Sequence, residues 1–177
     1  MVCGLASEAA VIRRAFAAAG NAPACDVLIS GADTVRAEAA ATKLAKAGVG
    51  ALVSAGLCGG LAPQLRVGDL VYGSAVIDAT TGDHRPAAQW LAPSSDESSP
   101  RWREGAIVGS DRAVLTVSDK AKIFDRTGAL AVDMESHAVA RAASRTNVPF
   151  FILRAVVDDA TMALPPFVSR ITSPSGR

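Results

Sequence analysis

Groups that could bind or react gather at three places in this 177-residue sequence. Each follows an apolar run, and the three are the segments 54–61 (SAGLCGGL), 132–136 (VDMES) and 154–159 (RAVVDD). Ligands of open α/β sheets bind beyond the carboxyl ends of the strands. If the apolar runs are strands of one sheet, the three segments are candidates for a single site.

Glycine in the first segment gives the chain a way to approach a ligand closely. Gly56, Gly59 and Gly60 lack side chains, so their backbone N–H groups could form a nest that accepts an anion. Neither the GxGxxG fingerprint nor a P-loop lysine is present. A tight turn that binds nothing is an equally good interpretation of the glycines alone.

Carboxylates characterise the other two segments. Glu135 could accept hydrogen bonds from sugar hydroxyls, unless Asp133 or Ser136 simply caps a helix whose N-terminal dipole Glu135 favours. Asp158, at the mouth of a very apolar strand, could donate a proton to a leaving group. The alternatives for it are a solvated pair with its neighbour or a salt bridge to Arg154.

Other kinds of chemistry find little support. His84 and His137 form neither a Ser-His-Asp order nor a metal cluster, and the cysteines lack zinc spacing, so no metal is expected. A formal net charge of +1 gives no electrostatic case for nucleic acid. No apolar run approaches the ~20 residues that span a bilayer, so we expect no transmembrane segment and a cytoplasmic protein with reduced thiols.

Apolar runs alternate with helical patterns along the chain. Strands are predicted at 1–5, 27–30, 51–55, 69–77, 106–109, 129–132 and 150–157, and helices at 8–19, 35–47, 119–125 and 135–145. The polar segment 80–104, which includes SSDESSP (94–100), is predicted to run over the surface and to be most mobile in its middle. This alternation predicts one domain over 1–177, a three-layer α/β/α fold with a mixed, largely parallel central sheet.

Together the segments resemble the nucleoside phosphorylase superfamily, which includes 5′-methylthioadenosine/S-adenosylhomocysteine nucleosidase. The similar stretches are GLASEA (4–9), SGADTVRAEAAA (30–41), SAGLCGGLAPQLRVGDLVYGSAVID (54–78) and VDMESHAVARAASRTNVPFFILRAVVDDA (132–160). The pairing of DMES with a downstream RAVVD is the most specific part. GLASEA and DDATMALPP (158–166) look like the hopanoid-associated phosphorylase branch, which is linked to removing adenine from adenosylhopane.

The resemblance implies a role for each segment. Asp158 falls at the acid that protonates N7 of the purine as the glycosidic bond breaks, and such general-acid catalysis suits an oxocarbenium-like transition state. Glu135 falls at the carboxylate that binds the ribose hydroxyls, and Met134 at the apolar residue packed on the sugar. The three glycines fall at the loop near the ribose and the nucleophile.

Some residues depart from the family pattern. Glu8 is one position early for the glutamate that activates water in the nucleosidases, and Leu57 stands where many relatives have serine. Asp33 replaces a glycine in the loop near phosphate, where only Arg36 could offset its charge.

The resemblance therefore implies cleavage of an adenine nucleoside, with inorganic phosphate as co-substrate, no other cofactor, and a homo-dimer or homo-trimer. The 5′ substituent stays open. Water as the nucleophile is the alternative, as is an inactive paralogue that only binds a nucleoside. Relatives continue past the acid into a further helix, so a truncated C-terminus is expected.

Overall fold

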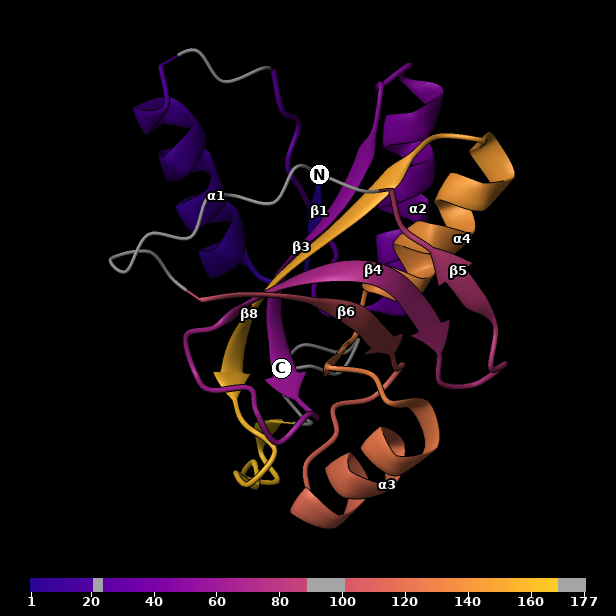
Figure 1. Ribbon diagram of the computed structural model, residues 1–177. Helices are drawn as coiled ribbons and strands as arrows, with labels where there is room; N and C mark the ends of the chain where they lie inside the picture. The colour runs from indigo at the N-terminus through magenta and orange to yellow at the C-terminus, as the bar shows by residue number, and fades with distance from the viewer. Residues whose placement is uncertain (21–23, 89–100, 169–177) are drawn as a thin grey trace.

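The computed structural model describes residues 1–20, 24–88 and 101–168, and shows strands and helices alternating along the chain (Figure 1). The strands are β1 (Val2–Cys3), β2 (Leu28–Ile29), β3 (Leu52–Gly60), β4 (Leu70–Asp78), β5 (His84–Pro86), β6 (Trp102–Gly109), β7 (Ala131–Asp133) and β8 (Phe150–Asp158). The helices are α1 (Ala6–Ala18), α2 (Thr34–Lys46), α3 (Val117–Thr127) and α4 (Ser136–Thr146).

All eight strands belong to one mixed sheet. Its main path runs β2-β1-β3-β7-β6-β4-β5, while β8 pairs with both β3 and β4. The pairs β1–β2, β1–β3, β3–β8, β4–β6 and β6–β7 are parallel, whereas β3–β7, β4–β5 and β4–β8 are antiparallel. Five strands therefore close a ring in the order β3, β8, β4, β6, β7. The predicted mixed, largely parallel sheet is confirmed.

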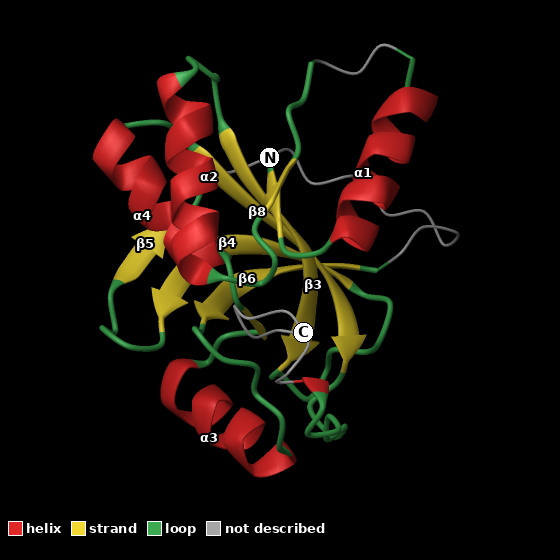
Figure 2. Ribbon diagram, turned by 180° about the vertical axis from the view of Figure 1, so that it is seen from behind, coloured by secondary structure: helices red, strands yellow, loops and turns green. Residues whose placement is uncertain are grey.

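Helices cover the sheet from different sides (Figure 2). In this view α2 and α4 lie together on one side, α1 lies on the other, and α3 sits beyond one end of the strands. Buried alanines of α4 let this helix approach the strands closely. No helix among the described residues is long and apolar enough to cross a membrane.

Local sequence signals explain where the helices begin and end. The side chain of Asp33 caps α2 by accepting the N–H of Arg36 at 2.9 Å. Thr116 caps α3 in the same way, and Gly128 ends that helix in the left-handed conformation with φ 63°.

Two predicted strands are too short. β3 continues through the glycine cluster to Gly60, because β8 pairs with it along most of its length and β7 pairs with its end. The glycines are therefore in a strand and do not form a turn or an anion nest. β6 begins at Trp102, inside the segment predicted to be irregular, because it pairs with β4 from Leu70 onward.

The long strand predicted around Gly73 does bend there. The register between β4 and β6 shifts between Gly73 and Ala75, and a Cβ on Gly73 would lie 2.7 Å from Ile152. The middle of the segment 80–104, predicted to be mobile, falls largely in 89–100, which lies outside the described residues.

Candidate active site

A pocket of about 260 Å³ opens at the carboxyl ends of β3 and β8. The start of α1, the loop after β6 and the turn from β7 into α4 complete its wall. Apolar lining comes from Leu57, Val114, Val132, Val157 and Leu164. Four carboxylates also line it, namely Glu8, Asp133, Glu135 and Asp158. All three segments singled out in the sequence therefore contribute to one cavity.

A buried arginine organises the acidic end of the pocket. Arg154 is fully buried in β8, and its Nη2 lies 2.5 Å from Asp133 Oδ2 while its Nη1 lies 3.3 Å from Glu135 Oε2. The same Nη2 donates to Ser54 Oγ at 2.5 Å and to Ser136 Oγ at 3.1 Å. Burial disfavours the guanidinium charge, but the two carboxylates more than offset this and raise the pKa of Arg154.

Glu135 is the carboxyl with the most perturbed environment. It occupies the position before α4, yet its side chain makes no cap bond and lines the pocket instead. Burial raises its pKa to about 7, the negative charges of Asp133 and Glu8 add to this, and Arg154 opposes it. Near neutral pH this side chain therefore carries a proton for part of the time.

Glu8 converges on the same place from the first turn of α1. Its Oε2 accepts the N–H of Leu5 at 2.7 Å, and its Oε1 accepts the N–H of Leu57 at 2.8 Å. A Cβ added to Gly4 would lie 2.7 Å from Glu135 Oε1 and 3.3 Å from Glu8 Oε2, so the two carboxylates meet above this glycine. Glu8 stands one position before the place expected for the water-activating glutamate of the nucleosidases, but its side chain still lines the pocket.

Asp158 has a partner that is not part of this cluster. It is 2% exposed, and its Oδ2 accepts from the ammonium of Lys120, which is itself fully buried on α3. Asp159, its neighbour in sequence, accepts from the N–H and the hydroxyl of Thr161. The predicted alternative, a salt bridge between Asp158 and Arg154, does not form.

Gly56, Gly59 and Gly60 have different surroundings. Gly59 lines the pocket, where a Cβ would lie 3.0 Å from Asp158 Oδ2. A Cβ on Gly56 would lie 2.6 Å from Glu8 Oε1 and 2.8 Å from Arg154 Nη1. Gly60 packs beside the backbone of Asp158. They allow close packing of side chains within the site.

Two other residues named from the sequence differ in position. Met134 lines the pocket, between Asp133 and Glu135. Arg36 is exposed on the first turn of α2 and does not line this pocket, so the structure does not bring it to the carboxylates.

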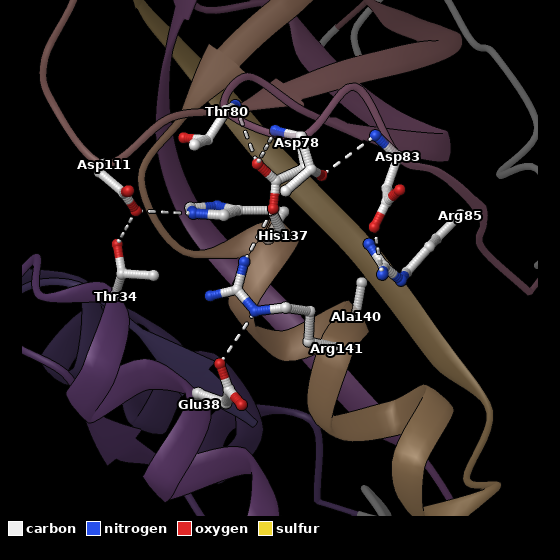
Figure 3. A network of polar contacts seen from close by, with 12 residues as sticks. Thr34, Glu38, Asp78, Thr80, Asp83, Arg85, Asp111, His137, Ala140 and Arg141 are labelled. Atoms are coloured by element: carbon white, nitrogen blue, oxygen red, sulfur yellow. Dashed lines mark hydrogen bonds and ion pairs between the residues drawn. The ribbon is translucent and has the colours of Figure 1, made fainter.

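A second polar network holds the loop that follows β6 (Figure 3). Asp111 accepts from Thr34 at 2.8 Å and hydrogen-bonds Nε2 of the buried His137 at 3.0 Å. Arg141 lies between Glu38 and Asp78, at 2.9 and 2.8 Å. These contacts join α2, α4 and the end of β4 beneath a loop whose next residues line the pocket.

Sequence reasoning missed Arg154 and Lys120 as members of the site. Each carried a signal: Arg154 interrupts the apolar run FFILRAVVD, and Lys120 lies three and four residues before the apolar Ile123 and Phe124 on one helical face. A cation on a buried face needs an anionic partner.

Two curated proteins have sequences similar to this chain over part of their length. The chain is 29% identical over 140 residues to aminodeoxyfutalosine nucleosidase of Campylobacter jejuni, covering 68% of this chain and 61% of that protein. It is 32% identical over 124 residues to futalosine hydrolase of Streptomyces coelicolor, covering 59% of this chain and 52% of that protein. The chain thus matches less than two thirds of the length of either relative.

The fold is similar to that of a solved nucleosidase. The crystal structure of 5′-methylthioadenosine/S-adenosylhomocysteine nucleosidase from Neisseria meningitidis, in complex with methylthio-immucillin-A, superposes with a TM-score of 0.72. The match covers 97% of this chain and 87% of that one at 22% identity. The family model described as Phosphorylase superfamily matches residues 18–166. Since this match takes in β2 to β8 and most of the pocket, the chain belongs to the Phosphorylase superfamily.

Proposed function

We propose that the protein cleaves the N-glycosidic bond of an adenine nucleoside with water as the nucleophile. The observation that carries this proposal is the meeting of Glu8, Glu135 and Asp158 in one largely apolar pocket. Glycoside cleavage needs an acid for the leaving group and groups that bind and attack the sugar. Here Glu8 and Glu135 lie together over Gly4, whereas the acid Asp158 contacts Lys120.

Asp158 serves the purine end of the pocket. As the C1′–N9 bond breaks, its electron pair passes to the purine, and a proton from Asp158 to N7 makes the base a better leaving group. Leu57, Val114 and Val157 supply the apolar lining suited to a flat base.

Glu135 and Glu8 serve the ribose end. Glu135 lies in the turn between β7 and α4, where it can hydrogen-bond ribose hydroxyls, with Met134 beside it to pack on the sugar. Glu8 is fixed by two backbone N–H groups and is only half-buried, so it can accept a proton from an attacking water molecule.

The charge of the pocket favours water over phosphate. Both buried cations near the carboxylates are already paired, Arg154 with Asp133 and Glu135, and Lys120 with Asp158. A phosphate dianion would meet the negative charge of Glu8, and Arg112, which is exposed, is the cation among the lining residues. The names of the two curated relatives, a nucleosidase and a hydrolase, support the same choice. Phosphorolysis, which sequence analysis preferred, becomes the alternative.

Release of adenine from a panel of nucleosides, with and without phosphate, tests the proposal. The panel is adenosine, methylthioadenosine, aminodeoxyfutalosine and an adenosylated lipid; futalosine and inosine are added to test the base. We expect phosphate-independent release, with oxygen-18 from labelled water appearing in the free sugar. Formation of a sugar 1-phosphate would replace hydrolysis by phosphorolysis.

The lipid arm tests the adenosylhopane hypothesis, which stays a prediction. Adenine binding in calorimetry without release from any nucleoside would contradict the enzymatic proposal and favour a binding protein.

A further inference from the structure

We propose that Lys120 is a positioning residue for the acid Asp158. Lys120 determines which carboxyl oxygen of Asp158 faces the purine, and its positive charge stabilises the carboxylate that remains after proton transfer. This inference rests on the proposed function of Asp158. It concerns a buried cation that neither the sequence pattern nor the ribose-binding cluster accounts for.

The ammonium of Lys120 is fully buried, and each of its N–H groups has an acceptor. Its Nζ donates to Asp158 Oδ2, to the backbone O of Asp159 at 2.6 Å and to the backbone O of Met162 at 2.9 Å. An ammonium has three hydrogens, so each has one acceptor. A buried charge is tolerated only when it is paired and hydrogen-bonded, and this geometry meets both conditions.

These contacts restrict Asp158 in a specific way. With Oδ2 held by Lys120, Oδ1 is the oxygen left for the base, and the carboxyl cannot rotate without breaking its buried hydrogen bond to the ammonium. Lys120 also ties the end of β8 to the turn that follows it, through Asp159 and Met162. Leu164, two residues farther on, lines the pocket and donates its N–H to Leu115 O at 2.8 Å.

The charge balance of the reaction gives the ammonium a role beyond position. In the reactive state Asp158 is the neutral acid, with its proton on Oδ1 and Oδ2 accepting from Lys120. This proton leaves for N7 of the purine, the electron pair of the C1′–N9 bond goes to the purine, and Lys120 keeps all its protons. Asp158 thus becomes negative as the bond breaks, and it does so beside a fully buried cation. Preorganised charge of this kind favours the transition state over the ground state.

Lys122 on the same helix provides a matched control. Its side chain is 72% exposed and its Nζ lies 3.3 Å from Asp119 at the surface. Lys120→Ala and Lys122→Ala remove the same group two residues apart, one inside the site and one outside it.

The experiment measures kcat and KM per folded enzyme, with folding checked by circular dichroism. We expect Lys120→Ala to lower kcat by about 100-fold, the lower part of the range for general-acid catalysis. KM should change less than fivefold, because the ribose contacts remain, and Lys122→Ala should match the wild type. Lys120→Arg, which keeps the charge, should be less impaired than Lys120→Ala.

Added ethylammonium separates this role from a structural one. The alanine variant leaves a space where a small ammonium ion can donate to Asp158, so kcat should recover at least tenfold, whereas tetramethylammonium, which has no N–H, should have no effect. A kcat within threefold of the wild type, or equal failure of both ammonium ions, would overturn the proposal. If Lys120→Ala does not fold, the activity of Lys120→Arg is the test. Activity equal to that of the wild type supports the proposal, and activity as low as that of Asp158→Asn refutes it.

Binding of free adenine, measured by calorimetry, tests the role of Lys120 independently of whether the protein cleaves a nucleoside. If the wild type releases no adenine, the function fails, and calorimetry then reports on Lys120 alone. A positioned Asp158 predicts that adenine binds Lys120→Ala about two- to fivefold more weakly than Lys122→Ala, in line with the small change expected in KM, and equal affinities would refute it.

Discussion

Glu135→Gln should change how the stability of this protein depends on pH. The wild-type side chain is buried beside Asp133 and Glu8, which together with burial raises its pKa from 4.5 to about 7. The folded protein therefore holds a proton that the unfolded chain releases near pH 4.5. Stability from this group is fully present below pH 4.5 and is lost as the pH rises through 7.

The size of the effect follows from the same values. A difference between 4.5 and about 7 corresponds to ~3 kcal/mol, at about 1.4 kcal/mol for each pH unit. Domains of this size unfold with ~5–15 kcal/mol, so the loss is a large part of the total. Glutamine has the same shape and does not titrate, so Glu135→Gln should escape this loss.

Urea unfolding followed by circular dichroism from pH 4.5 to 8, at one protein concentration, measures the difference. We expect the stability of the wild type relative to Glu135→Gln to fall by about 3 kcal/mol across this range. Glu104→Gln, at an exposed position of β6, is the control and should follow the wild type. Parallel pH curves for the wild type and Glu135→Gln would refute the reasoning and show that Arg154 keeps Glu135 ionised in the folded state.

Three further predictions concern the same pocket. Asp158→Asn should reduce turnover by roughly 10²–10⁴-fold while nucleoside affinity changes only a few-fold, and Asp159→Asn is its control; a loss under tenfold would exclude the acid role. Arg154→Met should destabilise the protein by about 3–5 kcal/mol in urea unfolding at pH 8, because it leaves buried carboxylates unpaired, and a change under 1 kcal/mol would contradict this. Gly56→Ala should displace Glu8, since its Cβ would lie 2.6 Å from Oε1; kinetics should show a loss of at least tenfold in kcat, and unchanged kcat would mean that Glu8 takes no part in the reaction.

Sequence patterns predicted most of the fold because the signals were local. The apolar run at β8 and the helical spacing at α2 and α4 depend on residues that are close in the chain, and the observed elements agree within a few residues. The end of β3 could not be predicted in this way. A glycine cluster has little strand propensity of its own, and pairing with β7 and β8 keeps it extended.

Some residues of the candidate site could also be predicted from local sequence, and others could not. The motif around Glu135 and Asp158 drew attention to residues that do line one pocket. The partners of these acids could not be assigned, since Arg154 lies 19 residues from Glu135 and Lys120 lies 38 residues from Asp158. Lys120 differs from Lys122 locally only in sharing a helical face with Ile123 and Phe124, and this spacing does not identify the acid with which Lys120 pairs.

The position of β8 has a consequence for how the molecule reaches its native state. β3 and β4 follow one another in sequence, yet β8, made some seventy residues later, lies between them and pairs with both. Until β8 has been synthesised, the edges of β3 and β4 that pair with it lack this partner. Such long-range pairing slows folding and exposes strand edges to association. Because β8 also supplies Arg154 and Asp158, the step that closes the ring is the same step that first creates the binding pocket.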